Sequence, residues 1–171
     1  MKDLPEAFCS SWLDIYFDIR QTIFQIMPDE NNSSAKGIHS EKAPEPVGLY
    51  PHAKRVGNLL FLSGVGPRER GTKKIPGVEL DDKGEIISYD IEAQCHSVFR
   101  NVKAILEDAG SSWNSIVDVT VYLTNMKDDF PKYNKLWADY FKDNPPCRTT
   151  VEINCLPTPI AIELKVIATI D

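Results

Sequence analysis

The sequence predicts an α+β fold in which two helices cover one face of a mixed, six-stranded sheet. The chain has 171 residues, of which 42% are hydrophobic and 26% charged, and this composition is ordinary for a domain with its own core. In the main domain, apolar residues recur at helical spacing in two long segments, and six further stretches have the character of short strands. The resulting order, β-β-β-α-β-α-β-β, has too few helices to cover both faces of the sheet.

The first half of the domain contains short strands and loops. Residues 54–64 (KRVGNLLFLSG) have the pattern of a β-hairpin, because Gly57-Asn58 is a favoured turn pair between two apolar runs. Residues 64–77 form a loop rich in glycine and basic residues. Residues 81–88 (DDKGEIIS) predict a turn followed by the third strand.

Two helices are predicted in the second half. The first runs between Asp90, a favourable N-cap, and Gly110, a favourable stop. The second covers residues 128–143, with Pro131 in its first turn. Their expected buried positions are Ile91, Cys95, Val98, Phe99, Val102, Ile105, Leu106 and Ala109 in the first, and Tyr133, Leu136, Trp137, Tyr140 and Phe141 in the second.

Three strands complete the sheet, over residues 115–126, 147–155 and 160–170. In the first of them, alternation places Val117, Val119, Val121 and Leu123 on one face. Because both helices lie on one face, we expect the open face to carry Arg148, Thr150 and Glu163 beside apolar residues. A partly apolar open face is typical of subunit contact, so we expect an oligomer whose sites lie where sheet faces meet.

The N-terminal 36 residues differ from the rest of the chain. Apolar residues at helical spacing in 4–27 predict a helix, and PDENNSSAKG (28–37) predicts a flexible linker. We therefore divide the chain into a helical extension with its linker, 1–36, and a main domain, 37–171. Docking of the helix on the protein itself is favoured over docking on a partner or a membrane surface. Its acidic polar face argues against the membrane surface.

Composition narrows the classes of partner. The net charge of −6 makes nucleic acid an unlikely main partner, since such proteins usually present a basic face. No run approaches the ~20 apolar residues of a membrane span, and the N-terminus has neither signal nor transit character, so we expect a cytoplasmic protein. The four cysteines show no metal-binding spacing and are interpreted as reduced thiols.

Arg148 and Glu163 are the strongest candidates for chemistry. Arg148 follows Pro145-Pro146-Cys147, and a rigidly placed arginine suits bidentate binding of a carboxylate. Glu163 lies in an aliphatic strand, where a carboxylate can orient water or exchange a proton. The two predict a site for a small carboxylic acid. On the pattern alone, a purely structural ion pair between them is favoured over such a site.

Two weaker candidates lie in the first half of the domain. Ser63 and Gly64 present backbone N–H groups to an anion, or Gly64 serves only as a turn residue. His52 is either an acid or base, or an ordinary surface histidine.

Three separated segments carry a family resemblance over residues 44–170. They are GLYPHAKRVGNLLFLSG, VDVTVYLTNMKDDFPKYNKLW and CRTTVEINCLPTPIAIELKVIA. Together they resemble the signature of the YjgF/Rid family, the reactive-intermediate (enamine/imine) deaminases. The motifs YPHAKR, SGVGPR, GVELDDKG and CRTTVE look most similar to the 2-aminomuconate deaminase branch.

The resemblance implies a chorismate-mutase-like fold and a homotrimer with clefts between subunits. It assigns substrate carboxylate binding to Arg148 and the attacking water to Glu163. The implied substrate-binding residues are Tyr50, Ser63, Gly64, Phe130 and Thr150, the last standing where many members have cysteine. Pro51-His52 replaces the more usual Ser-Gln, and Lys165 replaces a frequent glutamate.

The implied reaction is hydrolysis of a small enamine or imine acid, such as 2-aminomuconate or 2-aminoacrylate, without metal or organic cofactor. A six-carbon diacid needs a second cation, for which Arg68 is the candidate, unless it is only a solvated loop residue. Two alternatives of other classes remain: an RNA-acting translation inhibitor, and a non-catalytic protein that binds small acids.

Overall fold

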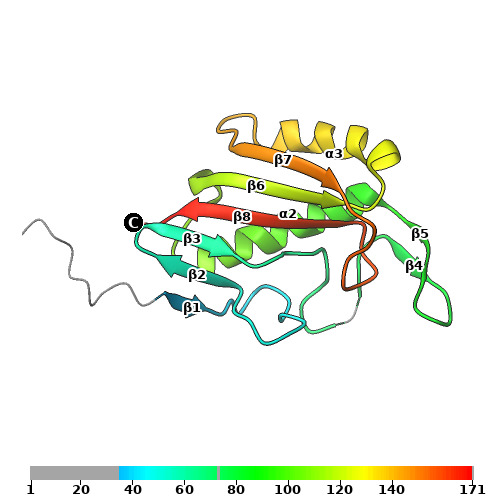
Figure 1. Ribbon diagram of the computed structural model, residues 1–171, viewed down its shortest axis with the longest axis horizontal. Coiled ribbons are helices and arrows are strands. Elements are labelled where there is room, and N and C mark those ends of the chain that lie inside the picture. Colours follow the sequence, from blue (N-terminus) through cyan, green and yellow to red (C-terminus); the bar gives the residue numbers. More distant parts are fainter. Residues whose placement is uncertain (1–34, 73, 171) are drawn as a thin grey trace, which may run out of the picture. The chain divides into compact units, whose positions relative to one another are not determined.

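The computed structural model describes residues 35–72 and 74–170 (Figure 1). The chain divides into two units, 1–34 and 35–171, and the second holds all the elements described below. The boundary falls two residues before the predicted domain start at Gly37. The predicted N-terminal helix lies outside the described residues.

The main sheet has six strands in the order β1-β2-β3-β8-β6-β7. The β6–β7 pair is parallel and the other pairs are antiparallel, so the predicted mixed, six-stranded sheet of an α+β fold is confirmed. In spatial order the strands are β1 (Lys36–Ile38), β2 (Ala53–Val56), β3 (Leu59–Leu62), β8 (Ile162–Thr169), β6 (Ile116–Leu123) and β7 (Cys147–Glu152).

One member of the sheet differs from the prediction. The third predicted strand corresponds to β5 (Ile86–Tyr89), which pairs only with β4 (Val78–Leu80), outside the main sheet. Its place is taken by β1, within a segment predicted as linker. Strand β1 is three exposed or half-buried residues long and is held by its pairing with β2, so it has no apolar pattern to detect.

Helix α2 (Ile91–Asp108) has the predicted ends. The Asp90 side chain accepts hydrogen bonds from the N–H groups of Glu92 and Ala93. Beyond the helix, Gly110 has a φ of 83°, which favours glycine, and its N–H donates to the carbonyl of Glu107. The Ser111 N–H donates to the carbonyl of Leu106, which completes the C-terminal cap.

Helix α3 (Met126–Tyr140) starts two residues earlier than predicted, so Pro131 lies in its second turn. The Asn125 side chain accepts from the Asp128 N–H, and the Glu152 carboxylate at the end of β7 accepts from the Met126 N–H at 2.6 Å. This capping from a distant strand offsets the unsatisfied donors of the first turn. The local sequence does not predict this start of α3, because Glu152 belongs to a distant strand.

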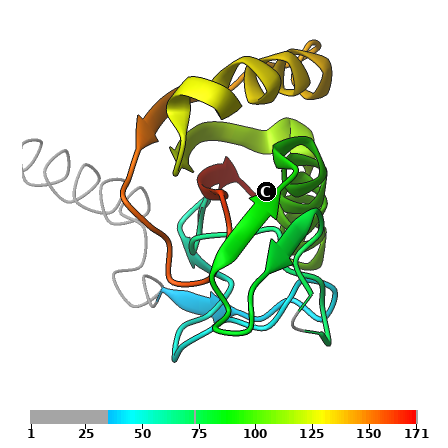
Figure 2. The same ribbon diagram turned by 90° about the vertical axis from the view of Figure 1, so that its right-hand side faces the viewer.

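Both helices pack on the same face of the main sheet, as predicted. Helix α2 contacts β8, helix α3 contacts β6, and the two helices contact each other. Figures 1 and 2 show them on one side of the curved sheet. In the described ranges, no helix combines the length and apolar character that a membrane crossing needs. Sheet residues buried against the helices are Leu60, Leu62, Val119, Val121, Leu123, Ile162, Leu164, Val166 and Ala168.

Val117 does not join this buried set, contrary to the prediction, and is 45% exposed. The register between β6 and β8 shifts between Ile116 and Asp118, so Val117 is an extra residue in a β-bulge. Ile116, one position earlier, is buried in its place.

Candidate active site

The register of the sheet places Arg148 and Glu163 on opposite faces. Arg148 lies opposite Val119 in the parallel β6–β7 pair, and Val119 is buried against the helices. Glu163 lies opposite Tyr122, three positions along β6 from Val119 and therefore on the other face. The expectation that both share the open face is wrong, because each strand's alternation was readable but the register between strands was not.

The structural ion pair between Arg148 and Glu163 is also absent from the part of the chain that the structure describes. The Arg148 Nη1 donates instead to Asn134 Oδ1 on α3, at 3.0 Å. Within one subunit, Arg148 and Glu163 therefore do not neutralise each other, and a functional role for either charge requires another partner.

The surroundings of Arg148 are formed by α3 and β7, and we call this group the Arg148 half-site. Arg148 Cζ lies 5.0 Å from the ring centroid of Trp137, 5.7 Å from Tyr133 and 5.8 Å from Phe130. Aromatic faces attract a guanidinium, so the cation is held in one region although no carboxylate among the described residues pairs with it. Thr150 lies opposite Val121 and shares the helix-facing side with Arg148.

Two hydroxyl groups in the Arg148 half-site are buried without a hydrogen-bond partner among the described residues. They are Tyr133 Oη and Thr150 Oγ1. Burial raises the pKa of the Tyr133 phenol, although the nearby Arg148 acts in the opposite direction, so the phenol stays neutral. An unpaired buried hydroxyl lowers the stability of the folded protein by about 1–3 kcal/mol, so its removal should have a measurable effect.

Glu163 belongs to a second group, the Glu163 half-site. Its carboxylate lies directly against the α-carbon of Gly64, where an added Cβ would overlap it. Within the described ranges it makes no hydrogen bond or ion pair, and burial raises the pKa of its carboxyl group. A carboxyl group that keeps its proton more readily is suited to proton exchange near neutral pH.

Four predicted substrate-binding residues meet in one hollow beside Gly64. These are Tyr50, Ser63, Gly64 and Arg68, and His52 also lines it. The Ser63 hydroxyl donates to the Pro51 carbonyl at 2.7 Å, and its N–H donates to the His52 carbonyl at 2.9 Å. Ser63 has thus used its donors, whereas the Gly64 N–H has no backbone partner among the described residues.

His52 is buried, contrary to the interpretation as a surface histidine, with 7% of its surface exposed. Its Nδ1 accepts from the Ser40 N–H at 2.9 Å, which requires Nε2 to carry the proton and to donate to the Pro44 carbonyl, also at 2.9 Å. Both ring nitrogens are occupied. His52 therefore fixes residues 40–44 beside the hollow, a role that sequence spacing did not reveal.

The eight predicted site residues thus fall into two groups. Phe130, Arg148 and Thr150 lie in the Arg148 half-site. The remaining five are Tyr50, Ser63, Gly64 and Arg68 around the hollow, and Glu163 against Gly64. Sequence reasoning did not place Tyr133 or Asn134 beside Arg148, and it named His52 only as an acid, a base or a surface histidine. Each of the three contributes through a contact that is distant in sequence.

Known proteins share the sequence pattern and the fold of this chain. The model of the family described as endoribonuclease L-PSP matches residues 40–170. A RutC family protein of Pyrococcus abyssi is 42% identical over 131 residues, which cover 77% of this chain and 94% of that protein. Reactive Intermediate Deaminase A of Arabidopsis thaliana, a chloroplastic protein, is 34% identical over 78% of this chain and 65% of its own length.

Solved structures show the same fold. The Rid family protein YyfA of Yersinia pestis superposes with a TM-score of 0.69 at 33% identity, covering 80% of this chain and all of that one. Escherichia coli TdcF with bound serine gives 0.67 at 29% identity, covering 80% and 99%. An α+β protein with this fold and these relatives is a Rid-type protein. The chain belongs to the Rid (YjgF) family, as its sequence motifs indicated.

Proposed function

We propose that this protein is a hydrolytic deaminase of small enamine and imine carboxylic acids. The observation that carries the proposal is the presence, in separate half-sites, of an arginine suited to a carboxylate and a half-buried glutamate suited to proton exchange. A relative of this chain is named a reactive intermediate deaminase, which supports the same reaction class. We assign carboxylate binding to Arg148 and activation of water to Glu163.

The active site is assembled from two subunits. Because Arg148 and Glu163 lie on opposite faces of one sheet, one subunit alone does not bring them together. A homotrimer of the chorismate-mutase-like type provides clefts in which the Arg148 half-site of one copy meets the Glu163 half-site of its neighbour. A closed ring of identical contacts satisfies every copy at once.

The reaction begins with tautomerisation of the enamine to the imine. Arg148 holds the carboxylate and withdraws electron density from the conjugated system. Water oriented by Glu163 adds its oxygen to the C=N carbon, and Glu163 passes a proton to the nitrogen. The hydroxyl proton of this carbinolamine then passes through Glu163 to the nitrogen, and the C–N bond breaks, which releases ammonia and leaves the C=O of the keto acid.

The substrate that we favour is a diacid such as 2-aminomuconate, with 2-aminoacrylate as the smaller candidate. Arg68 supports the diacid, because it lines the hollow with Tyr50 and Gly64. Its Nη2 donates to the Glu45 carbonyl at 2.7 Å, and its other N–H groups have no partner among the described residues. These groups are available to a second carboxylate.

Ammonia release from 2-aminomuconate and 2-aminoacrylate, each generated in situ, tests the proposal. We expect Arg148→Ala and Glu163→Gln to reduce the rate by about 10²-fold or more, the typical cost of losing one electrostatic or acid–base contribution. Lys165→Ala is the control, because Lys165 is an exposed residue two positions further along β8. Wild-type release no faster than in buffer would remove the enzyme assignment.

An RNA-directed activity is the second candidate, supported by the endoribonuclease description of the matching family model. The net charge of −6 opposes it. Steeply salt-dependent RNA binding and RNA cleavage, both insensitive to Arg148→Ala, would favour it. Saturable binding of a carboxylate without ammonia release would instead identify a non-catalytic small-acid-binding protein.

A further inference from the structure

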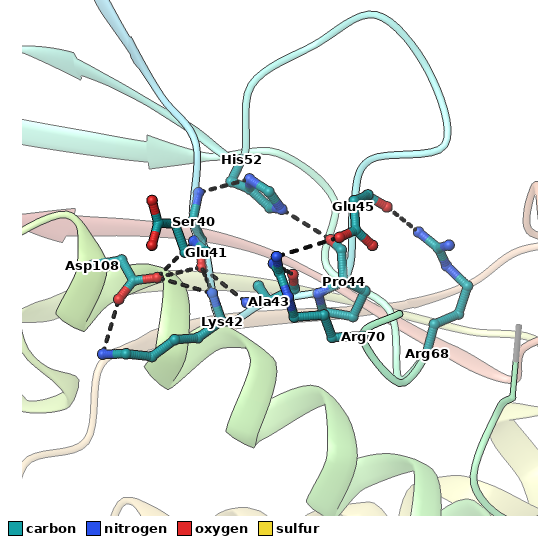
Figure 3. A network of polar contacts seen from close by, with 10 residues as sticks. All are labelled: Ser40, Glu41, Lys42, Ala43, Pro44, Glu45, His52, Arg68, Arg70 and Asp108. Atoms are coloured by element: carbon teal, nitrogen blue, oxygen red, sulfur yellow. Dashed lines mark hydrogen bonds and ion pairs between the residues drawn. The ribbon is translucent and has the colours of Figure 1, made fainter. Parts of the chain in front are cut away.

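A short segment, residues 40–45, forms one wall of the Tyr50 hollow, and we call it the strap. Ala43 and Pro44 of the strap line the hollow together with Tyr50 and Arg68. The strap connects to three separate parts of the domain, namely His52, helix α2 and the loop that carries Arg68 and Arg70. Figure 3 shows these connections as one continuous network of polar contacts.

The connection to helix α2 is made by Asp108, the last residue of the helix. Its Oδ2 accepts from the Ser40 hydroxyl at 2.7 Å, from the Glu41 N–H at 2.9 Å and from the Lys42 N–H at 3.2 Å. Its Oδ1 lies 2.9 Å from the Lys42 ammonium. One carboxylate therefore holds three consecutive residues of the strap.

The other end of the strap holds Arg68. The Glu45 carbonyl accepts from Arg68 Nη2 at 2.7 Å. Arg70 fixes the same end, because its Nη1 donates to the Ala43 carbonyl at 3.0 Å and its Nη2 lies 3.5 Å from the Glu45 carboxylate. The position of the Arg68 guanidinium thus depends on the strap, and the strap depends on Asp108.

An acidic residue is unfavourable at the C-terminal end of a helix, where the helix dipole is negative. The contacts with the strap offset this cost, because hydrogen bonds to a charged group are stronger than neutral ones. The same hydrogen bonds lower the pKa of Asp108 from 3.8 to about 2, with the Ser40 hydroxyl as the largest cause. Asp108 is therefore anionic at every pH at which the protein would be assayed.

We infer that Asp108 is a positioning residue that determines preference for a second carboxylate on the ligand. It acts through the strap on Arg68 and does not line the hollow itself. The inference rests on the proposed function, because it concerns the acid that enters that site. It predicts that disturbing the strap reduces binding of diacids while monoacids bind as before.

The two probes are trans,trans-muconate and sorbate, a six-carbon diacid and the monoacid that has the same diene chain. They differ only in the second carboxylate. Dissociation constants are measured by calorimetry for the full-length chain and for Asp108→Ala, Asp108→Asn, Ser40→Ala and Arg68→Ala. Glu107→Ala is the matched control, because Glu107 precedes Asp108 on the helix and pairs with Lys103 instead of the strap.

We expect wild type to bind muconate more tightly than sorbate. Arg68→Ala is expected to remove about tenfold of this preference, the effect of one charge-assisted hydrogen bond. Asp108→Ala should reduce the preference for muconate over sorbate by a similar factor, with sorbate binding unchanged. Asp108→Asn and Ser40→Ala should reduce this preference less. Glu107→Ala should behave as wild type.

Equal binding of the two probes by wild type would overturn the inference. It would also be overturned if Arg68→Ala changed the preference and Asp108→Ala did not, or if Asp108→Ala weakened both probes equally. If Asp108→Ala does not fold, the ratio of the muconate and sorbate dissociation constants is measured for Ser40→Ala and Asp108→Asn, and a ratio equal to that of wild type in both would overturn the inference. Arg148→Ala tests the proposed function separately, since unchanged sorbate binding in that variant would contradict the role of Arg148 whatever the ratio shows.

Discussion

The two half-sites hold their charged groups by different means. Arg148 lies over three aromatic rings and donates to an amide, so its charge is stabilised by side chains of α3. Glu163 lies against a glycine and has no polar partner among the described residues. An arginine stays charged in almost any environment, whereas a carboxyl group exchanges protons near neutral pH only when its surroundings disfavour the anion.

The two environments differ because the half-sites lie on different faces of the main sheet. The helix-facing side supplies aromatic residues from α3, and the open side supplies a close backbone contact at Gly64. Placing the two groups on opposite faces lets each environment form without the other. Under the proposed function, catalysis then depends on the meeting of two copies, which can be tested by separating the two functions genetically.

The largest expected effect comes from mixing two inactive variants. Arg148→Ala and Glu163→Gln should each lose nearly all deaminase activity. After the two are mixed, unfolded and refolded together, about a quarter of the clefts of a random ring should combine an intact Arg148 with an intact Glu163. We therefore expect ammonia release to return to about a quarter of the wild-type rate.

The double variant, refolded with wild type, is the control for the number of intact copies. If the mixture of single variants stays inactive while this control is active, the two residues do not act across a subunit contact. The comparison between the half-sites would then describe two unrelated features.

The next largest effect is expected at Gly64. An added Cβ in Gly64→Ala would overlap the Glu163 carboxylate, which must move. Because reacting groups tolerate little displacement, we expect deaminase activity to fall about 10–100-fold. Carboxylate binding by Arg148, measured with sorbate, should change much less.

Gly37→Ala is the matched control, because its added Cβ would meet Pro51 only at an ordinary contact distance of 3.5 Å. Equal losses of activity in both variants would point to a general effect of the substitution. Unchanged activity in Gly64→Ala would show that the position of Glu163 against Gly64 is unimportant.

Much of this architecture was predictable, because it depends on local pattern. Helix α2 ends where Asp90 and Gly110 indicate, and the alternation of β8 correctly separates Glu163 from its buried neighbours. Alternation within each strand could not predict whether Arg148 and Glu163 lie on the same face of the sheet. It depends on the pairing of Val119 with Arg148 and of Tyr122 with Glu163, and a shift of one residue in either pair would reverse the result.

The candidate site shows the same limit. Arg148 and Glu163 attract attention because a charge in an apolar strand is costly. His52 was only a weaker candidate and Asp108 was not one, because histidine and aspartate are ordinary in loops and at exposed helix ends. Their contacts with Ser40 span 12 and 68 residues of sequence, and only the folded chain brings these groups together.

A smaller effect is expected on stability when Glu163 is neutralised. The pKa of Glu163 is raised above 4.5 by burial, so the folded state binds more protons than the unfolded state above that pH. Wild-type stability should therefore fall as pH rises through the folded pKa, and Glu163→Gln should lack this decrease. We expect Glu163→Gln to have a higher free energy of unfolding than wild type at pH 7. At pH 4 we expect this difference to be smaller or absent.

Urea unfolding at one fixed protein concentration measures this difference, since oligomer stability depends on concentration. Asp108→Asn is the control with the opposite sign. The pKa of Asp108 is lowered from 3.8 to about 2, so its contribution is present above 3.8 and is lost as pH falls toward about 2. A Glu163→Gln variant that is less stable than wild type at pH 7 would contradict a half-buried carboxyl group without a polar partner among the described residues.

The smallest expected effect lies in the Arg148 half-site, at the Tyr133 hydroxyl. This hydroxyl is buried without a partner among the described residues, so Tyr133→Phe should raise the free energy of unfolding by about 1 kcal/mol. Tyr89→Phe is the matched control, because the Tyr89 hydroxyl donates to the buried Asp129 carboxylate at 2.8 Å. That variant should be destabilised by about 1.5–3 kcal/mol. A destabilised Tyr133→Phe would show that the assembled protein uses this hydroxyl, which would place a further polar contact beside Arg148 where the subunits meet.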